Sequence, residues 1–367
     1  MMKRVTLMLL LLPVPAVALA QMPSQAAEDD RAASARVQPR TEAGTADATL
    51  DEADAVPQVR PVPPPRPLPV IPRRRGSMVG YIDDAVVASK VRVRFETGLH
   101  NTVPDRAEFF YAKCGCYQDL LKSNPAYDPG APGPRPGAVS DLNFQQAYVQ
   151  GEYAGGGRVS VFAELPTRWI QPQAFVPGTG GTFPNRAGVG DLRAGAKIAL
   201  VAQPGQAATI QLVAFLPTGK AENGLGTHHQ SLQSSLLLFN RVTDRVAIES
   251  QFGVWHPWDG SAGNPTAQDK KFSGDVLIYG VGPSVEVYRS SRVQFAPVVE
   301  LVGWRVLNGF QTGGPAADAS GTNIVNLKIG GRVVWAGRNS FYAGWGHALT
   351  TEVWYKDIVR FEYRYSF

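Results

Sequence analysis

The chain has 367 residues, of which 36 are basic and 31 acidic, and its formal net charge is +5. This near balance argues against a nucleic-acid-binding protein, because such proteins carry a large and clustered basic excess. Hydrophobic residues make up 44% of the sequence and 38 residues are glycine, a composition that fits strands with one apolar face better than an oily core.

The first twenty residues have the features of a secretory signal peptide. Lys3 and Arg4 precede an apolar run over residues 7–19, and Ala18-Leu19-Ala20 offers small residues for cleavage after Ala20. No later apolar stretch reaches the roughly 18 residues that a membrane-spanning helix needs. We therefore expect an exported chain that is either soluble or a β-barrel.

After the signal peptide, the sequence predicts an N-terminal arm in two parts. Residues 21–56 are polar, rich in alanine and acidic residues and without aromatics, so we expect them to be disordered. Residues 57–76 are rich in proline and arginine, which favours an extended polyproline II spacer. This segment is either a periplasmic tether or, through residues 57–75, a docking motif for a periplasmic partner or peptidoglycan.

The remainder, residues 77–367, is predicted to be an all-β, transmembrane antiparallel barrel of about twelve strands. Short segments with two-residue alternation follow one another from Lys90, and no helical periodicity is sustained. Leu142 and Phe144 have a parity opposite to that of Ala147 and Val149, which suggests a bulge or a misplaced strand start. The segments begin near residues 89, 141, 158, 189, 207, 230, 244, 273, 292, 322, 339 and 355.

The connections between these segments alternate between short turns and long loops rich in glycine, proline and asparagine. This is the pattern of outer-membrane barrels, whose short turns are periplasmic and whose long loops face outward. An even number of strands also places both ends of the barrel in the periplasm. Most tryptophans fall at strand ends and are expected to form aromatic girdles at the membrane interfaces. They are Trp169, Trp255, Trp258, Trp304 and Trp354 at the outer ends and Trp335 at an inner end.

The last thirteen residues, 355–367, alternate most clearly. Phe361, Tyr363 and Phe367 share one parity, whereas Arg360 and Arg364 share the other. In a barrel the aromatic face meets lipid and the charged face meets the lumen. The segment resembles the closing strand of bacterial outer-membrane barrels, which implies outer-membrane lipid and the barrel-assembly machinery as partners.

Parity also predicts which charged residues line the lumen. Because the set mixes both signs, we expect ion pairs between neighbouring strands, and either a closed interior or a narrow path. The basic residues near the first and last strands form a ladder that would attract anionic solutes such as aromatic carboxylates. The predicted lumen residues are Arg92, Arg94, Glu96, Arg193, Lys197, Glu249, Glu300, Lys328, Arg332, Arg360, Glu362 and Arg364.

Cys114 and Cys116 are the two cysteines of the chain. In an oxidising compartment they are candidates for a disulfide, either with each other or between chains, and a local bridge or two free thiols are favoured over a redox site. A zinc site would need further ligands, which the neighbouring sequence does not offer. We expect no metal and no cofactor.

An enzyme, most plausibly a hydrolase, is the competing class. His228 and His229 lie close to Ser231, and His256 lies close to Asp259. Adjacent residues of a strand point to opposite faces, so both histidines of the first group cannot readily serve one site. We therefore expect loop histidines and no catalytic residues. A third class is a structural barrel that anchors a partner-binding arm.

Two stretches resemble the outer-membrane β-barrel family of the meta-pathway of phenol degradation. Residues 188–197, GVGDLRAGAK, are similar to that family's strand opening, and Leu216-Pro-Thr-Gly219 with Gly224-Leu-Gly226 is similar to its outer loop. The resemblance spans roughly residues 140–367 and does not include the N-terminal arm or the cysteine pair. It implies an outer-membrane channel or transporter of a Gram-negative bacterium for small hydrophobic or aromatic solutes, including anionic aromatics.

Overall fold

The computed structural model describes residues 76–105, 112–258, 262–264, 267–312 and 317–367. The signal peptide, the acidic segment and the proline-rich segment through residue 75 lie outside the described residues. In the described part, no helix is both long and apolar enough to span a membrane.

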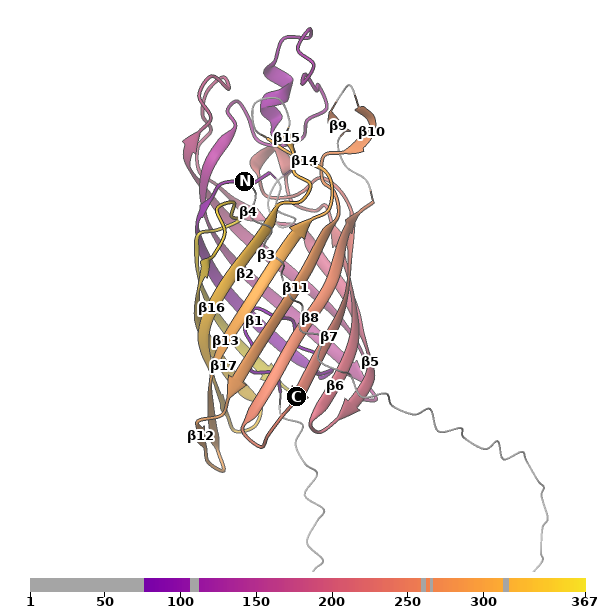
Figure 1. Ribbon diagram of the computed structural model, residues 1–367, viewed down its shortest axis with the longest axis vertical. Helices are drawn as coiled ribbons and strands as arrows, with labels where there is room; N and C mark the ends of the chain where they lie inside the picture. The colour runs from indigo at the N-terminus through magenta and orange to yellow at the C-terminus, as the bar shows by residue number, and fades with distance from the viewer. Residues whose placement is uncertain (1–75, 106–111, 259–261, 265–266, 313–316) are drawn as a thin grey trace, which may run out of the picture. The chain divides into compact units, whose positions relative to one another are not determined.

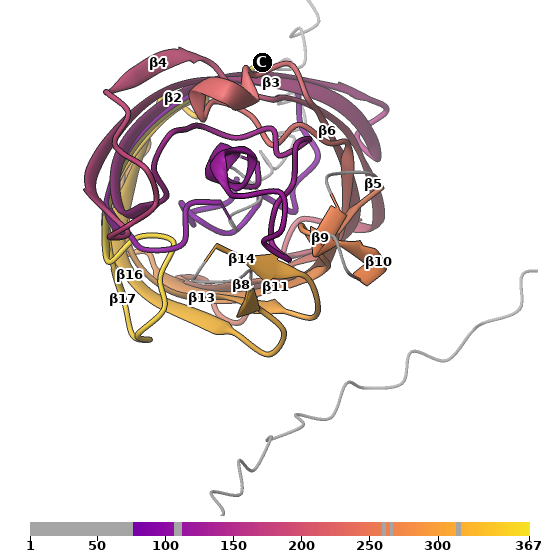
Figure 2. The same ribbon diagram turned by 90° about the horizontal axis from the view of Figure 1, so that it is seen from above.

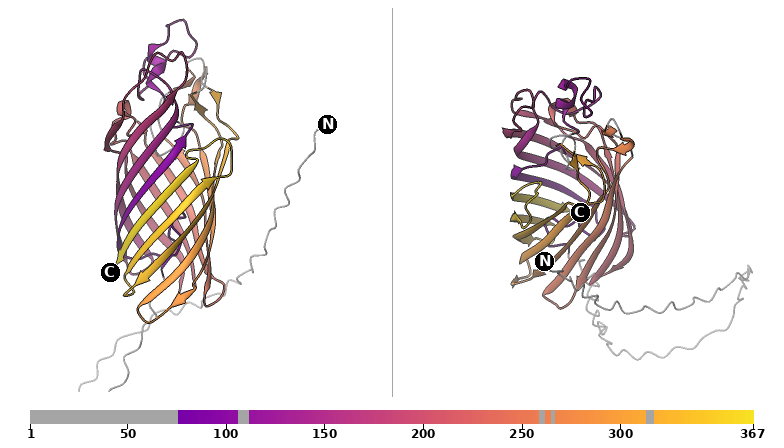
Figure 3. Two further views of the ribbon diagram at one scale, coloured as in Figure 1. Left: turned by 90° about the vertical axis from the view of Figure 1, so that its left-hand side faces the viewer. Right: turned by 45° about the horizontal axis from the view of Figure 1, so that its top comes forward.

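Twelve long antiparallel strands form a closed barrel, which confirms the predicted fold class. Each strand pairs with the next along the chain, and the first pairs with the last from Lys90↔Ser366 to Leu99↔Asp357 (Figures 1 and 3). The strands are β1 Lys90–Asn101, β2 Val139–Gly155, β3 Val159–Phe175, β5 Leu192–Gln203, β6 Gln206–Leu216, β7 Ser231–Arg241, β8 Val246–Pro257, β11 Val276–Val285, β13 Val293–Val306, β16 Asn323–Trp335, β17 Asn339–Ala348 and β18 Asp357–Ser366.

Short elements extend the barrel or lie in its connections. β4 pairs with residues 167–170 of β3, and β12 pairs with the start of β13. Two small hairpins, β9–β10 and β14–β15, belong to long loops. Their bounds are β4 Arg186–Val189, β9 Ala262–Asn264, β10 Ala267–Lys271, β12 Tyr288–Arg289, β14 Phe310–Gln311 and β15 Ala317–Asp318, with 3-10 helices η1 Gly115–Asp119 and η2 Ala221–Asn223.

The two faces of the strands differ as expected for a barrel in a membrane. On β1, the apolar side chains of Val91 and Val93 are 43% and 45% exposed on the outside, whereas Arg92 and Arg94 are 9% and 7% exposed on the inside. A soluble protein would bury the apolar face and expose the charged one. The inverted arrangement, an apolar exterior around a polar interior, is that of a transmembrane β-barrel.

The parity change near the start of β2 has a different cause from the one expected. The strand runs without interruption from Val139 to Gly155. Its register shifts lie between Val139 and Leu142 against β3 and between Leu142 and Phe144 against β1, not between Phe144 and Ala147. Leu142 and Phe144 point inward with the polar residues that follow, and both are buried. The Phe144 ring lies 6.3 Å from the Tyr355 ring, so apolar side chains fill the upper lumen there.

The expected outer girdle of tryptophans is only partly present. Trp169 and Trp258 are exposed, but Trp255, Trp304 and Trp354 are buried, with exposed fractions of 8% or less. Trp255 and Trp304 have the inward parity of their strands, and Trp354 lies in the connection between β17 and β18. Their position near a strand end was therefore insufficient to place them at the lipid interface.

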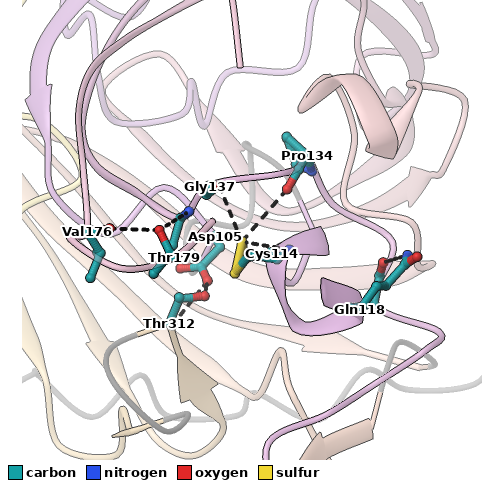
Figure 4. Close-up of a disulfide and its surroundings, with 11 residues drawn as sticks. Asp105, Cys114, Gln118, Pro134, Gly137, Val176, Thr179 and Thr312 are labelled. Carbon is teal, nitrogen blue, oxygen red and sulfur yellow. Dashed lines mark hydrogen bonds between the residues drawn. A yellow bond between two sulfur atoms is a disulfide. The ribbon is translucent and has the colours of Figure 1, made fainter. Parts of the chain in front are cut away.

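The connection between β1 and β2 forms a cap at the long-loop end of the barrel. Figure 2 shows its η1 helix above the ring of strands. A disulfide joins Cys114 and Cys116, and both residues belong to a small apolar cluster with Tyr117, Phe272 and Phe310. The local bridge thus sits in a packed loop, where the Cys114 sulfur also approaches the carbonyl oxygens of Pro134 and Gly137 at 3.7 Å (Figure 4).

Candidate functional site

All twelve predicted lumen residues lie inside the barrel. Eleven are buried and Arg193 is half-buried. The closure of β1 on β18 brings together the ladder of basic residues, because Arg92 faces Arg364 in the register and Glu96 faces Arg360.

Most of these charges form ion pairs, as predicted from the mixture of acidic and basic residues in the set. Glu164, on β3, accepts from three guanidinium groups: Arg92 at 3.0 Å, Arg94 at 3.3 Å and Arg193 at 3.1 Å. Glu96 pairs with Arg360 at 2.6 Å across the closure. Since a buried charge without a partner is costly, this sharing stabilises the polar interior.

A second cluster surrounds Glu362 on β18. Its carboxylate accepts from Arg332 at 2.8 Å and from Arg364 at 2.9 Å, and Arg92 lies 3.6 Å away. Three guanidinium groups again share one carboxylate, so the wall near β1 and β18 has an excess of positive charge.

Residues Gly76–Ser89 enter the lumen, which the alternation of side chains did not predict. This inserted segment precedes β1 and is held by carboxylates of the barrel wall. Glu300 accepts from the backbone N–H groups of Gly80, Tyr81 and Ile82 at 3.1, 2.9 and 2.9 Å. Glu249 accepts in the same way from the N–H groups at 78 and 79, at 2.9 and 3.3 Å.

Basic residues of the wall bind the carbonyl groups and the aspartate of the inserted segment. Arg332 donates to the carbonyl oxygens of residues 78 and 79 at 3.1 and 2.8 Å, and Arg360 donates to that of Gly80 at 2.6 Å. Asp84 pairs with Lys90 at 2.7 Å and with Arg364 at 3.1 Å. Several predicted lumen residues therefore bind this segment of the chain itself.

The inserted segment enters and leaves at the short-turn end. Gly76 shares a mouth cavity of about 580 Å³ with the turns at 290–292 and 337–339, and Phe367 donates its backbone N–H to Ser89 at 3.1 Å. The binding uses mainly backbone groups of the segment, which leave no periodic pattern in the sequence. The contact does require glycine at Gly80, because a Cβ at this position would clash with the Tyr342 ring.

A chamber of about 140 Å³ remains in the lumen beside the inserted segment. Tyr81 and Asp83 of that segment line one part of it, and Trp354 and Tyr355, from the connection before β18, line another. Its charged lining consists of six basic residues, Arg92, Arg94, Arg193, Lys197, Lys328 and Arg360, and three acidic residues, Asp83, Glu96 and Glu164.

The chamber wall is also aromatic. The Trp304 ring lies 5.2 Å from that of Trp354 and 6.2 Å from that of Tyr355. Ile278, Val302 and Ile358 continue this apolar side, whereas Tyr148 lies under the Arg94 guanidinium at 3.9 Å on the basic side. The chamber therefore combines an apolar surface with a positive one.

The histidines considered for an enzyme lie in separate surroundings within the described residues. His256 pairs with Asp275 at 2.5 Å; Asp259, the neighbour considered from the sequence, lies outside the described residues. His229 is buried against Trp255 and His228 is exposed. Across the described ranges, no group of three or more histidine, cysteine, aspartate or glutamate side chains is arranged to hold a metal ion.

The two stretches that carry the family resemblance contact one another. Asp191 accepts from the backbone N–H of Gly219 at 3.0 Å and from the N–H and hydroxyl of Thr227 at 2.7 and 2.8 Å. A Cβ at Gly226 would lie 2.5 Å from the Asp191 carboxylate. These contacts thus fasten the connection between β6 and β7 to the start of β5, whereas Arg193 and Lys197 of the first stretch line the chamber.

No family model and no curated protein matches this sequence. The chain is similar in structure to an outer membrane channel from Pseudomonas putida F1, with 13% identity, a TM-score of 0.48 and coverage of 77% of this chain and 96% of the other. It is also similar to the beta domain of the Bordetella autotransporter BrkA, with 14% identity, a TM-score of 0.43 and coverage of 76% and 100%. For the KdgM porin the identity is 6%, the TM-score 0.37 and the coverage 76% and 99%.

Proposed function

We propose that the protein is an outer-membrane channel or transporter of a Gram-negative bacterium for small hydrophobic or aromatic solutes, including anionic aromatics. The observation that carries this proposal is the lumenal chamber, which joins an aromatic wall to an excess of basic residues. Apolar pockets with a few convergent polar groups are the usual form of small-molecule sites.

The inserted segment explains how such a path is kept closed. A barrel of about twelve strands is narrow, so a single extended segment of chain is enough to fill part of its lumen. The segment is held by hydrogen bonds to charged side chains, such as the three from its N–H groups to Glu300. Each bond to a charged group contributes about 1.5–3 kcal/mol, so these bonds keep the segment in the lumen. A shift of this segment would join the chamber to the mouth cavity at the short-turn end.

Planar bilayers provide the test. The refolded protein should give discrete single-channel openings, a reversal potential that indicates anion preference in a salt gradient, and block by benzoate. Its folding would first be checked by far-UV circular dichroism. A folded protein that is silent, or that prefers cations, would contradict the proposal.

Export and assembly form the second part of the proposal. A signal peptide cleaved after Ala20 would direct export, and the aromatic C-terminal strand would be recognised by the barrel-assembly machinery. Deletion of Phe367 should then lower the amount of folded barrel in outer-membrane fractions. Normal assembly of the truncated chain would argue against this role.

The resemblance to the phenol-degradation family supports aromatic compounds as solutes.

The proline-rich residues 57–75, which lie outside the described residues, would contact a periplasmic partner. Cross-linking in the periplasm, compared between the full chain and a variant without 57–75, would detect such a partner.

A further inference from the structure

Lys328 differs from the other basic residues of the chamber in its partners. Arg92, Arg94 and Arg193 bind Glu164, Arg360 binds Glu96 and Lys197 binds Glu152. Among the described residues, no carboxylate lies within 4.0 Å of the Lys328 ammonium group, although the side chain is only 1% exposed. Glu300 and Glu96 act on this charge only at longer range, and Arg360 opposes them. A buried ammonium group without a carboxylate in contact is costly, so this position favours an anion.

Aromatic side chains surround the Lys328 ammonium group. It donates to the Tyr355 hydroxyl at 2.5 Å and lies 3.7 Å from the centre of the Tyr81 ring, 4.6 Å from that of Tyr355 and 5.6 Å from that of Trp304. Cation–π contacts stabilise the charge in part, but an ammonium group has three N–H donors and the hydroxyl takes one. A carboxylate oxygen would accept from the others.

The adjacent wall favours a flat apolar group. Trp304 lies next to the amine and packs against Trp354, whose indole N–H has no acceptor among the described residues. The volume of about 140 Å³ sets the size of an occupant. A buried apolar cavity of about 150 Å³ in another protein holds one benzene ring, so the chamber suits a single six-membered ring.

We propose that the chamber binds a monocyclic aromatic carboxylate, with its carboxylate paired to Lys328 and its ring against Trp304 and Trp354. This site deepens the proposed function, since it names the solute class and the residue that selects it. The remaining excess of basic residues would draw the anion into the lumen, while Lys328 would hold it.

Isothermal titration of the refolded protein in detergent tests the site, with benzoate as the probe. Benzoate should bind more tightly than benzamide, which has the same shape without the charge, and more tightly than acetate, which lacks the ring. Lys328→Met, which keeps most of the length of the side chain and removes its charge, should weaken benzoate binding roughly tenfold to a hundredfold. Lys356→Met, at an exposed lysine in the connection before β18, should leave the affinity unchanged.

Equal affinity of the wild-type protein for benzoate and benzamide would overturn the proposal, and this comparison requires no variant to fold. Benzoate affinity unchanged in a folded Lys328→Met protein would overturn it as well, even if the protein conducts in bilayers. Lys328-dependent binding in a protein that is silent in bilayers would support the site and contradict the channel function instead.

Discussion

Glu300 on β13 and Lys328 on β16 are register partners in adjacent strands, yet their charged groups bind different parts of the molecule. Glu300 accepts N–H groups from the inserted segment, and Lys328 donates to Tyr355. Tyr81 links the two, because its backbone N–H binds Glu300 and its ring lies against Lys328. The inserted segment thus takes the place of an ion pair that the register would otherwise allow.

Glu300→Gln should weaken the hold on the inserted segment. A neutral amide with one oxygen replaces a carboxylate that accepts three N–H bonds, and each bond to a charged group contributes about 1.5–3 kcal/mol. We expect longer or more frequent single-channel openings than in the wild type. Glu352→Gln, at an exposed glutamate, is the matched control; if both variants open alike, Glu300 does not hold the segment closed.

Arg94→Gln should reduce anion preference. Arg94 lines the chamber and shares Glu164 with two other arginines, so its loss lowers the positive excess. In the water-like surroundings of a conducting path, a unit charge about 4 Å from a passing ion changes the energy of that ion by about 1 kcal/mol, which corresponds to roughly a fivefold fall in the permeability ratio. Reversal potentials measure this ratio. The exposed Arg158, in the turn between β2 and β3, provides the control, and an equal shift in Arg158→Gln would count against a lumenal effect.

Ile329→Arg should destabilise the barrel in lipid. Ile329 follows Lys328 on the same strand but is 49% exposed on the outer face. An arginine near the middle of the lipid face of a barrel costs about 2–4 kcal/mol. Urea unfolding in liposomes would measure the free energy of unfolding. Leu121→Arg, in the outer cap where the side chain is 79% exposed, should have little effect; similar losses in both variants would contradict the assignment of a lipid face.

Asp191→Ala should loosen the connection between β6 and β7. The substitution removes acceptors for Gly219 and Thr227, and bonds to a charged group contribute about 1.5–3 kcal/mol each. We expect faster proteolysis of this loop at Lys220 with the barrel still folded. Glu222→Ala changes an exposed acidic residue of the same loop and should leave the cleavage rate unchanged.

Tyr117 in the outer cap should lose its phenolic proton at a higher pH than an exposed tyrosine. Its burial, together with the negative charge of Asp105, raises the pKa of Tyr117 from 10.0 to about 12. A group with a raised pKa in the folded state stabilises the cap below pH 10, and this contribution is lost as pH rises toward 12. The difference in tyrosinate absorbance between wild type and Tyr117→Phe should have its midpoint near pH 12. A midpoint near 10 would show that the ring is not buried in the cap.

The barrel could be predicted from local sequence patterns alone. Side chains alternate along a strand, so the parity of Val91, Arg92 and Val93 assigns the lipid and lumen faces without knowledge of any neighbour. The turn residues between segments set the strand boundaries, and β1, β13 and β17 begin within about one residue of the predicted positions. These features are local, which is why they could be predicted.

The filling of the lumen, in contrast, depends on contacts between distant parts of the chain. The inserted segment binds Glu249 and Glu300 through backbone N–H groups, across sequence separations of 171 and 220 residues for Met78 and Gly80. Every residue except proline has such a group, so no side-chain pattern marks the contact. The tryptophans of the chamber and the lack of a carboxylate beside Lys328 likewise depend on which strands and loops meet across the barrel, and alternation along one strand does not contain that information.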